Sequence, residues 1–218
     1  MTTQNIESDR QDILLQALPN VPFDGWTRAV MTGAAKEAGI TEARMRLAFP
    51  DGPMGLVTYF IAQGDEQMKV RLAKDDIGTL KIREKIIYAV RIWLELQEPN
   101  RDAVRRAVTL LSLPLSAGAA LRSLYGTVDA IWQAIGDTST DYNFYTKRMI
   151  LAGVFSSVLL QWLSDNSDDK EECWAFLDRR IANVMTFEKL KRRLPDVSGL
   201  ATAPFRILGS LRYPGFKR

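Results

Sequence analysis

Residues 137–148 read DTSTDYNFYTKR, and a run of fifteen residues without a charge follows from Met149 to Leu163. Thr138 and Asp141 have the S/T-x-x-D/E spacing of a residue pair that opens a helix. The uncharged run is shorter than the roughly 20 residues needed to cross a bilayer. We therefore expect a helix that begins in this stretch and is buried or forms an interface.

Three aromatic residues lie at the start of this helix, among polar and charged neighbours: Tyr142, Phe144 and Tyr145. Aromatic side chains at a helix entrance can belong to the core. The alternative is a surface patch that binds a partner. The residues alone leave both interpretations open.

The composition favours a binding protein over an enzyme. The chain has 218 residues, 46% of them apolar, enough for one sizeable domain or a domain with an appendage. It contains no histidine, and therefore no Ser-His or Cys-His nucleophile pair and no histidine metal site. Cys173, the single cysteine, excludes an intrachain disulfide and a cysteine-based metal site. We expect no catalytic residue, no metal and no conventional cofactor.

Charge is distributed unevenly along the chain. Residues 186–218 contain eight Lys and Arg against two acidic residues, although the whole chain carries a net charge of only +3. The basic C-terminal segment is therefore expected to contact an anionic surface. Met1–Arg10 has neither the apolar run of a signal peptide nor the Arg-rich composition of a transit peptide. We expect a cytoplasmic chain, or the processed product of a longer one.

Residues 1–72 have the pattern of three short helices followed by a long one. We expect helices over residues 9–17, 29–38, 42–48 and 55–73, with Thr27 and Thr41 as N-caps and Gly39 in a left-handed C-terminal position. This order resembles the N-terminal helix-turn-helix of TetR-type regulators, whose third helix enters the DNA major groove.

Two arginines on the helix that would face DNA, Arg44 and Arg46, could contact phosphates. However, residues 1–72 also contain nine acidic residues, and phosphate neutralisation supplies most of the non-specific affinity for DNA. We expect a degenerate helix-turn-helix that binds no nucleic acid. The alternative is a TetR-type DNA-binding transcription regulator.

The middle of the chain, residues 73–186, is predicted to be a helical body for ligand binding and dimerisation. Helices are expected over residues 78–97, 101–111, 121–135 and 171–184, and no stretch alternates with the period of a strand. The predicted fold class is therefore all-α, a TetR-like helical domain.

The last segment, residues 187–218, is predicted to be a basic linker followed by an amphipathic helix. A hinge at Pro195–Gly199 precedes apolar and basic residues that suit binding to an anionic membrane: Leu200, Phe205, Arg206, Leu208, Leu211 and Arg212. The alternative is a helix that docks on its own body or on a dimer partner.

Several motifs along the chain are those of one family. The signature at residues 137–148 is accompanied by GWT at 25–27, LAFPDG at 47–52, LAGVFSS at 151–157 and WAFLDRRI at 174–181. With the degenerate helix-turn-helix, these motifs resemble the coenzyme Q biosynthesis protein nine family, TetR-like lipid-binding accessory factors of ubiquinone synthesis. The resemblance extends from Ile13 to Met185.

This resemblance implies a homodimer with a bound lipid, which is an isoprenoid, a ubiquinone precursor or a phospholipid. The protein would present precursors to ring-modifying enzymes, notably the demethoxyubiquinone hydroxylase, through a patch at Tyr142, Phe144, Tyr145 and Arg148. Phe144 stands where the family has tryptophan. The resemblance also implies a peripheral place on the bacterial inner membrane, or on the matrix side in mitochondria.

Such a lipid needs an apolar cavity, because lifting it from the bilayer costs about 0.8 kcal/mol per exposed CH₂. We assign the lining to apolar residues expected on internal helix faces: Leu56, Phe60, Ile86, Val90, Trp93, Leu110 and Leu124. Each of these residues is also compatible with an ordinary core position.

Overall fold

The computed structural model describes the backbone of residues 3–137 and 142–193, and the side chains of residues 5–137 and 145–183. No residue in these ranges lies in a strand, in agreement with the predicted all-α fold. The chain divides into two compact units, Met1–Asp178 and Arg179–Arg218. The elements are α1 (Thr3–Ala17), α2 (Val21–Asp24), α3 (Arg28–Glu37), α4 (Glu42–Ala48), α5 (Pro53–Leu72), α6 (Ile82–Gln97), η1 (Glu98–Asn100), α7 (Arg101–Leu111), η2 (Pro114–Ser116), α8 (Ala117–Ala134), α9 (Tyr142–Ser164) and α10 (Glu171–Arg193).

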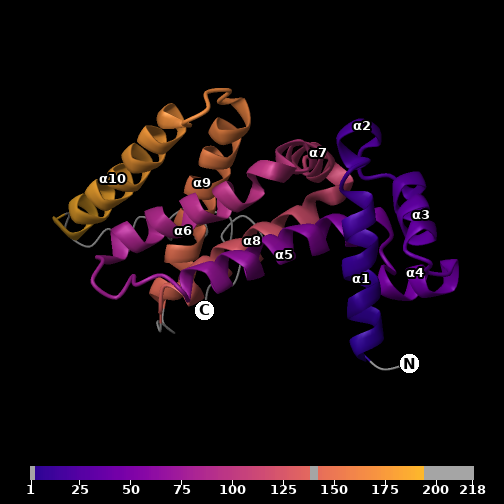
Figure 1. The fold of residues 1–218 in the computed structure, drawn as a ribbon. Helices are drawn as coiled ribbons and strands as arrows, with labels where there is room; N and C mark the ends of the chain where they lie inside the picture. The colour runs from indigo at the N-terminus through magenta and orange to yellow at the C-terminus, as the bar shows by residue number, and fades with distance from the viewer. Residues whose placement is uncertain (1–2, 138–141, 194–218) are drawn as a thin grey trace, which may run out of the picture. The chain divides into compact units, whose positions relative to one another are not determined.

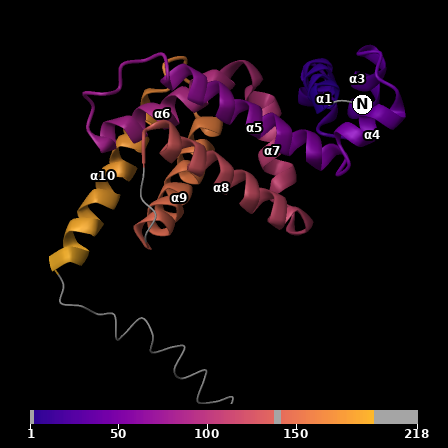
Figure 2. The ribbon, with the colours of Figure 1, turned by 90° about the horizontal axis from the view of Figure 1, so that it is seen from below.

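Helices α1, α3 and α4 gather at one end of the first unit (Figures 1 and 2). The predicted caps are confirmed, since the Thr27 hydroxyl accepts a hydrogen bond from the Val30 backbone N–H and the Thr41 hydroxyl accepts one from that of Arg44. Gly39 has a φ of 68°, in the left-handed region that favours glycine after a helix. Local side-chain and backbone chemistry therefore sets the starts of α3 and α4 and the end of α3.

The body of the first unit is built around α5, which lies along α8 and also packs on α6 (Figure 1). Helix α8 in turn packs against α9. Trp26 connects the N-terminal helices α1, α3 and α4 to this body. Its indole N–H donates a buried 3.0 Å hydrogen bond to the Ala103 carbonyl of α7. The Trp26 ring also packs on Phe60 of α5, with 5.2 Å between the ring centroids.

Some helix boundaries differ from the predicted ones. Helix α1 begins at Thr3, earlier than the predicted start at residue 9. Helix α6 begins at Ile82 and not at residue 78, because the Lys81 backbone N–H donates to the Glu84 carboxylate and fixes the first turn there. Helix α8 begins at Ala117, because the single turn of η2 leads directly into it.

Within the described residues, no individual helix is both long and apolar enough to span a bilayer. One bent pair, Ile82–Leu111 with Pro114–Ala134, meets that criterion jointly across a 96° bend.

Candidate functional site: two adjoining cavities

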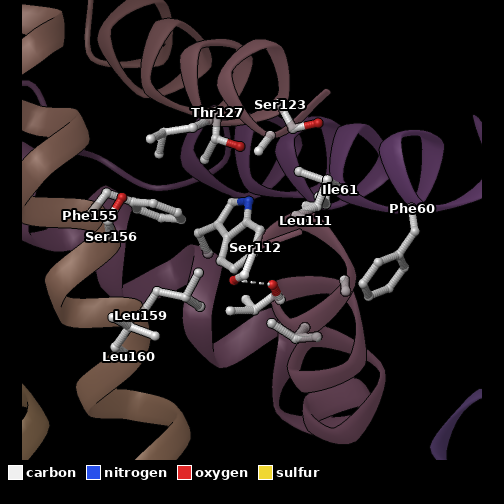
Figure 3. A pocket seen from close by; sticks show the side chains of 16 residues that line it. Phe60, Ile61, Leu111, Ser112, Ser123, Thr127, Phe155, Ser156, Leu159 and Leu160 are labelled. Carbon is white, nitrogen blue, oxygen red and sulfur yellow. Dashed lines mark hydrogen bonds between the residues drawn. The ribbon is translucent and has the colours of Figure 1, made fainter. Parts of the chain in front are cut away.

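An apolar cavity of about 260 Å³ lies in the body of the first unit and is lined by α5, α6, α7, α8 and α9 (Figure 3). Its lining is mostly aliphatic and aromatic, with four hydroxyl-bearing residues: Phe60, Ile61, Trp93, Val104, Ala107, Val108, Leu111, Ser112, Ala120, Ser123, Leu124, Thr127, Phe155, Ser156, Leu159 and Leu160. The volume is close to the lower end of the range of about 300–1,000 Å³ for small-molecule sites.

The apolar cavity arises where small residues on α7 and α8 face larger side chains of the neighbouring helices. Ala107 and Ala120 line the cavity, while Trp93 and Phe155 pack edge to face in its wall, with 5.1 Å between the ring centroids. Figure 3 shows Ser123 and Thr127 on one side of the cavity and Leu159 and Leu160 on another. The apolar side chains favour a hydrocarbon occupant.

Most polar groups in this lining are already engaged. The Ser112 hydroxyl donates to the Val108 carbonyl at 2.7 Å, and the Thr127 hydroxyl donates to a carboxyl oxygen of Asp65 at 3.2 Å. The indole N–H of Trp93 donates to the other Asp65 oxygen at 2.8 Å. Through these two hydrogen bonds, the Asp65 carboxyl of α5 links α5 to α6 and to α8.

Asp65 is a buried acid without a cationic partner in the described part of the chain. It is 7% exposed, and no ion pair involves it there. Burial raises the pKa of Asp65 to about 7, against the lowering effect of the hydrogen bonds from Trp93 and Thr127. Near neutral pH this carboxyl therefore exists in both the protonated and the ionised form.

A second cavity, of about 590 Å³, adjoins the first and shares Ile61 and Ser123 with it. Its lining is mixed, with charged and hydroxyl-bearing residues among small and apolar ones: Asp51, Met54, Gly55, Thr58, Ile61, Ala62, Asp65, Leu115, Ser116, Gly118, Ala119, Arg122, Ser123 and Gly126. Asp65 lies in the wall of this cavity. The two cavities therefore place an apolar and a polar compartment side by side between α5 and α8.

Three of the seven predicted lining residues border the apolar cavity, namely Phe60, Trp93 and Leu124. Leu56, Ile86 and Val90 are buried in the core but border neither cavity. Leu110 is half-buried and also borders neither.

The prediction missed the contribution of α9. Phe155, Ser156, Leu159 and Leu160 recur at helical spacing within the uncharged run from Met149 to Leu163, and this spacing could have identified them.

Of the predicted partner-binding residues, Tyr145 and Arg148 have described side chains, and these two differ in exposure. Tyr145 is 64% exposed, whereas Arg148 is only 2% exposed. The Arg148 guanidinium is paired with Asp129 at 2.7 Å and with Asp137 at 3.5 Å, and Lys147 also pairs with Asp137 at 3.0 Å. The side chain of Arg148 is therefore internal and not part of a surface patch.

Several predicted positions lie outside what the structure describes. The side chains of Tyr142 and Phe144 are outside the described side chains. The predicted membrane-binding residues are outside the described residues altogether: Leu200, Phe205, Arg206, Leu208, Leu211 and Arg212.

The two arginines considered for DNA contact are both bound to acidic residues of this chain. Arg44 donates to the Asp9 carboxylate, with one bond of 2.9 Å, and to the Asn5 side chain. Arg46 pairs with Glu42 at 2.5 Å on the same helix. Phosphate contacts would have to compete with these carboxylates.

Cys173 is fully buried. Burial raises the pKa of its thiol to about 11, which keeps the thiol in its unreactive protonated form. Among the described residues, no group of His, Cys, Asp and Glu side chains has the arrangement of a metal site.

The helical arrangement is that of TetR-type regulators. The solved structure of a TetR transcriptional regulator from Nitrosomonas europaea aligns with a TM-score of 0.62 and 17% sequence identity, covering 79% of this chain and 95% of that chain. At this identity the similarity shows the fold alone, and it confirms the predicted TetR-like fold.

Sequence comparison then shows which proteins this chain is similar to. The model of the family described as COQ9 matches residues 117–188. The chain is 33% identical over 187 residues to the "Ubiquinone biosynthesis protein COQ9-A, mitochondrial" of Xenopus laevis, and 31% identical over 194 residues to the Homo sapiens protein COQ9. These matches cover 83% and 84% of this chain but only 59% and 60% of the two relatives. The chain is thus a homologue of the COQ9 proteins, as the resemblance in its motifs had indicated.

Proposed function

We propose that this chain is a lipid-binding accessory protein of ubiquinone biosynthesis. In this proposal it holds an isoprenoid, a quinone precursor or a phospholipid at a membrane and presents ubiquinone precursors to ring-modifying enzymes such as the demethoxyubiquinone hydroxylase. The apolar cavity between α5 and α9 carries the proposal, in a chain whose relatives are named ubiquinone biosynthesis proteins. The function requires no catalytic group of its own.

The energetics of lipid transfer support a role for such a cavity. Each CH₂ group moved from water into an apolar site gains about 0.8 kcal/mol. One five-carbon isoprene unit buried among the side chains of α7 and α9 therefore offsets on the order of 4 kcal/mol of the cost of leaving the bilayer. A cavity lined by aliphatic side chains lowers this cost without binding any particular hydrocarbon tightly.

Extraction of lipid from the purified full chain tests the proposal. Native mass spectrometry is expected to find a bound isoprenoid, quinone precursor or phospholipid. Ala120→Phe, which places a ring in the apolar cavity, is expected to lower lipid occupancy at least fivefold. Ala117→Phe makes the same change on the same helix at an exposed position that borders neither cavity, and should retain the lipid. Equal occupancy in both variants would remove the cavity from the proposal.

The partner surface is proposed at the start of α9, around Tyr145 and its aromatic neighbours Tyr142 and Phe144. Tyr145 is well exposed at this helix start, and exposed aromatic residues are frequent anchors of protein interfaces. Phe144→Ala with Tyr145→Ala should weaken capture of the hydroxylase without lowering the melting temperature. Leu47→Ala, a similarly exposed apolar position on α4, is the control. Hydroxylase capture equal to that of the unmodified chain would exclude this surface.

Membrane attachment is proposed for the basic C-terminal segment, and a homodimer for the assembly. Removal of residues 199–218 should lower sedimentation with vesicles of anionic phospholipid, and added salt should weaken binding of the full chain. Sedimentation of the shortened chain at the full-length level would refute the role of this segment. Equilibrium ultracentrifugation of the full chain tests the dimer, and a monomer at micromolar concentration would contradict it. The membrane would be the bacterial inner membrane or, since the relatives are named mitochondrial, a membrane of mitochondria.

A further inference from the structure

The two adjoining cavities differ in character, and Asp65 lies at their boundary. Trp93 and Thr127 line the apolar cavity and donate their hydrogen bonds to Asp65, which lines the mixed one. The cavities share Ile61 and Ser123 in their walls and therefore lie next to each other. The site therefore has a place for a hydrocarbon tail and a separate place for a polar end.

The hydrogen-bonding capacity of Asp65 is only partly used. Each carboxyl oxygen has two acceptor positions. Within the residues that the structure describes, each oxygen of Asp65 accepts one bond, from Trp93 at 2.8 Å or from Thr127 at 3.2 Å. No cation within ion-pair distance neutralises the carboxyl in the described part of the chain. A protonated carboxyl can also donate a hydrogen bond, whereas an ionised one only accepts.

We propose that Asp65 binds the oxygen-bearing head of the lipid, a ring hydroxyl or ring carbonyl, in the mixed cavity while the isoprenoid tail occupies the apolar one. This inference rests on the proposed lipid-binding function and assigns to that site its selectivity for the head. A ring hydroxyl donates to a free acceptor position of Asp65, and a ring carbonyl accepts from its protonated form. A hydrocarbon without such oxygens leaves both positions unused.

Two lipids with one tail separate head recognition from tail binding. Farnesyl-hydroquinone and farnesylbenzene differ only in two ring hydroxyls, and each can displace a pyrene-labelled alkane from the full chain. The unmodified chain is expected to prefer the hydroquinone by roughly ten- to a hundredfold, as one or two buried hydrogen bonds would give. Asp65→Leu should remove this preference and leave the affinity for farnesylbenzene within about twofold.

A matched control is available one residue along the same helix. Glu66 is exposed, pairs with Lys69 and borders neither cavity, so Glu66→Gln removes a carboxylate without touching the site. It should keep the full preference for the hydroquinone. An unchanged preference in Asp65→Leu, or none in the unmodified chain while farnesylbenzene binds, would overturn the inference but not the proposed function. Failure of both lipids and of the labelled alkane to bind would overturn both.

A spectroscopic measurement does not depend on the folding of Asp65→Leu. At pH 5 the protonated carboxyl of Asp65 has a carbonyl stretch that farnesyl-hydroquinone should shift in an infrared difference spectrum. Farnesylbenzene should leave the band in place, and Asp65→Asn, which keeps an acceptor for Trp93, should lack the band. A band that farnesyl-hydroquinone does not move would refute contact between Asp65 and the head.

Discussion

The stability of this protein should depend on pH through Asp65, and Asp65→Asn isolates the effect. Asparagine keeps an oxygen that accepts from Trp93, and its amide can donate to the Thr127 hydroxyl. It therefore resembles the protonated carboxyl in both shape and hydrogen bonding. Unlike the carboxyl, it never carries the charge that burial between α5, α6 and α8 disfavours.

The sign and size of the change in the free energy of unfolding follow from the pKa of Asp65. Burial raises the pKa of Asp65 from its ordinary 3.8 to about 7 in the folded chain. As pH rises between these values, the unfolded chain releases the proton and the folded chain keeps it, so the free energy of unfolding falls by up to about 1.4 kcal/mol per pH unit. Between pH 5 and pH 7 the loss amounts to about 2 kcal/mol, and above about pH 8 it becomes constant. Asp65→Asn should not show this loss.

Few other groups interfere in this window. The chain contains no histidine, so no imidazole titrates between pH 5 and pH 8. The charged groups near Asp65 are Glu66 and Lys69 on its own helix, and Asp51 and Arg122 border the same cavity. The difference between variant and unmodified chain therefore reports on Asp65.

The assay is urea unfolding at pH 5, 6, 7 and 8 at constant ionic strength, followed by tryptophan fluorescence and circular dichroism. The free energy of unfolding of Asp65→Asn minus that of the unmodified chain should increase by about 2 kcal/mol from pH 5 to pH 7. Glu66→Gln should give a flat difference, because Glu66 is exposed. A flat difference for Asp65→Asn would show that the carboxyl is ionised throughout, and the argument from burial would be wrong.

Three further predictions concern packing, ion pairing and DNA. In the same urea assay, Gly64→Ala should lower the free energy of unfolding by about 1–2 kcal/mol, because its Cβ would lie 2.7 Å from the buried Gln97 amide nitrogen. Gly33→Ala, on α3, has open space around the new Cβ and should raise the free energy of unfolding by about 0.5–1 kcal/mol. In thermal unfolding, Arg148→Met should lower the free energy of unfolding by about 3–5 kcal/mol, because it leaves two carboxylates without their buried partner. Arg46→Ala breaks an exposed ion pair and should lower the free energy of unfolding by less than about 1 kcal/mol. In a low-salt gel shift the chain should show no tight duplex binding, and tight binding with a steep salt dependence would favour the transcription-regulator alternative.

The helix order was predictable because its signals are local. The caps at Thr27 and Thr41 and the left-handed Gly39 depend only on residues within one turn, so the sequence contains all the information needed. The start of α6, in contrast, was predicted at residue 78, which is too early. The competing interaction between Lys81 and Glu84 is equally local and fixes the start four residues later.

The cavity was only partly predictable, because internal faces of helices have the same sequence pattern whether they border a void or a neighbour. Phe60 borders the cavity and Leu56, four residues earlier on α5, does not. The difference arises from small residues on other helices, such as Ala107 and Ala120, which single-helix periodicity does not register.

The burial of Asp65, in contrast, was indicated by the local sequence, but the prediction did not include it. It shares the helical spacing of the buried Met68 and Leu72, which places an acid on the internal face of α5.

The signature DTSTDYNFYTKR combines residues with two separable roles. Its first residue, Asp137, is 7% exposed as a side chain and pairs with both Lys147 and Arg148 at its other end. The charged ends of the motif thus bind each other and hold the beginning of α9 against α8, where Asp129 completes the cluster. A partner that meets this surface therefore has the exposed Tyr145 to contact but not the buried guanidinium. Substitution of Arg148 should weaken the binding of a partner by unfolding the start of α9. Substitution of Tyr145 should weaken this binding with the fold intact. A melting curve recorded with each binding measurement therefore separates the two roles.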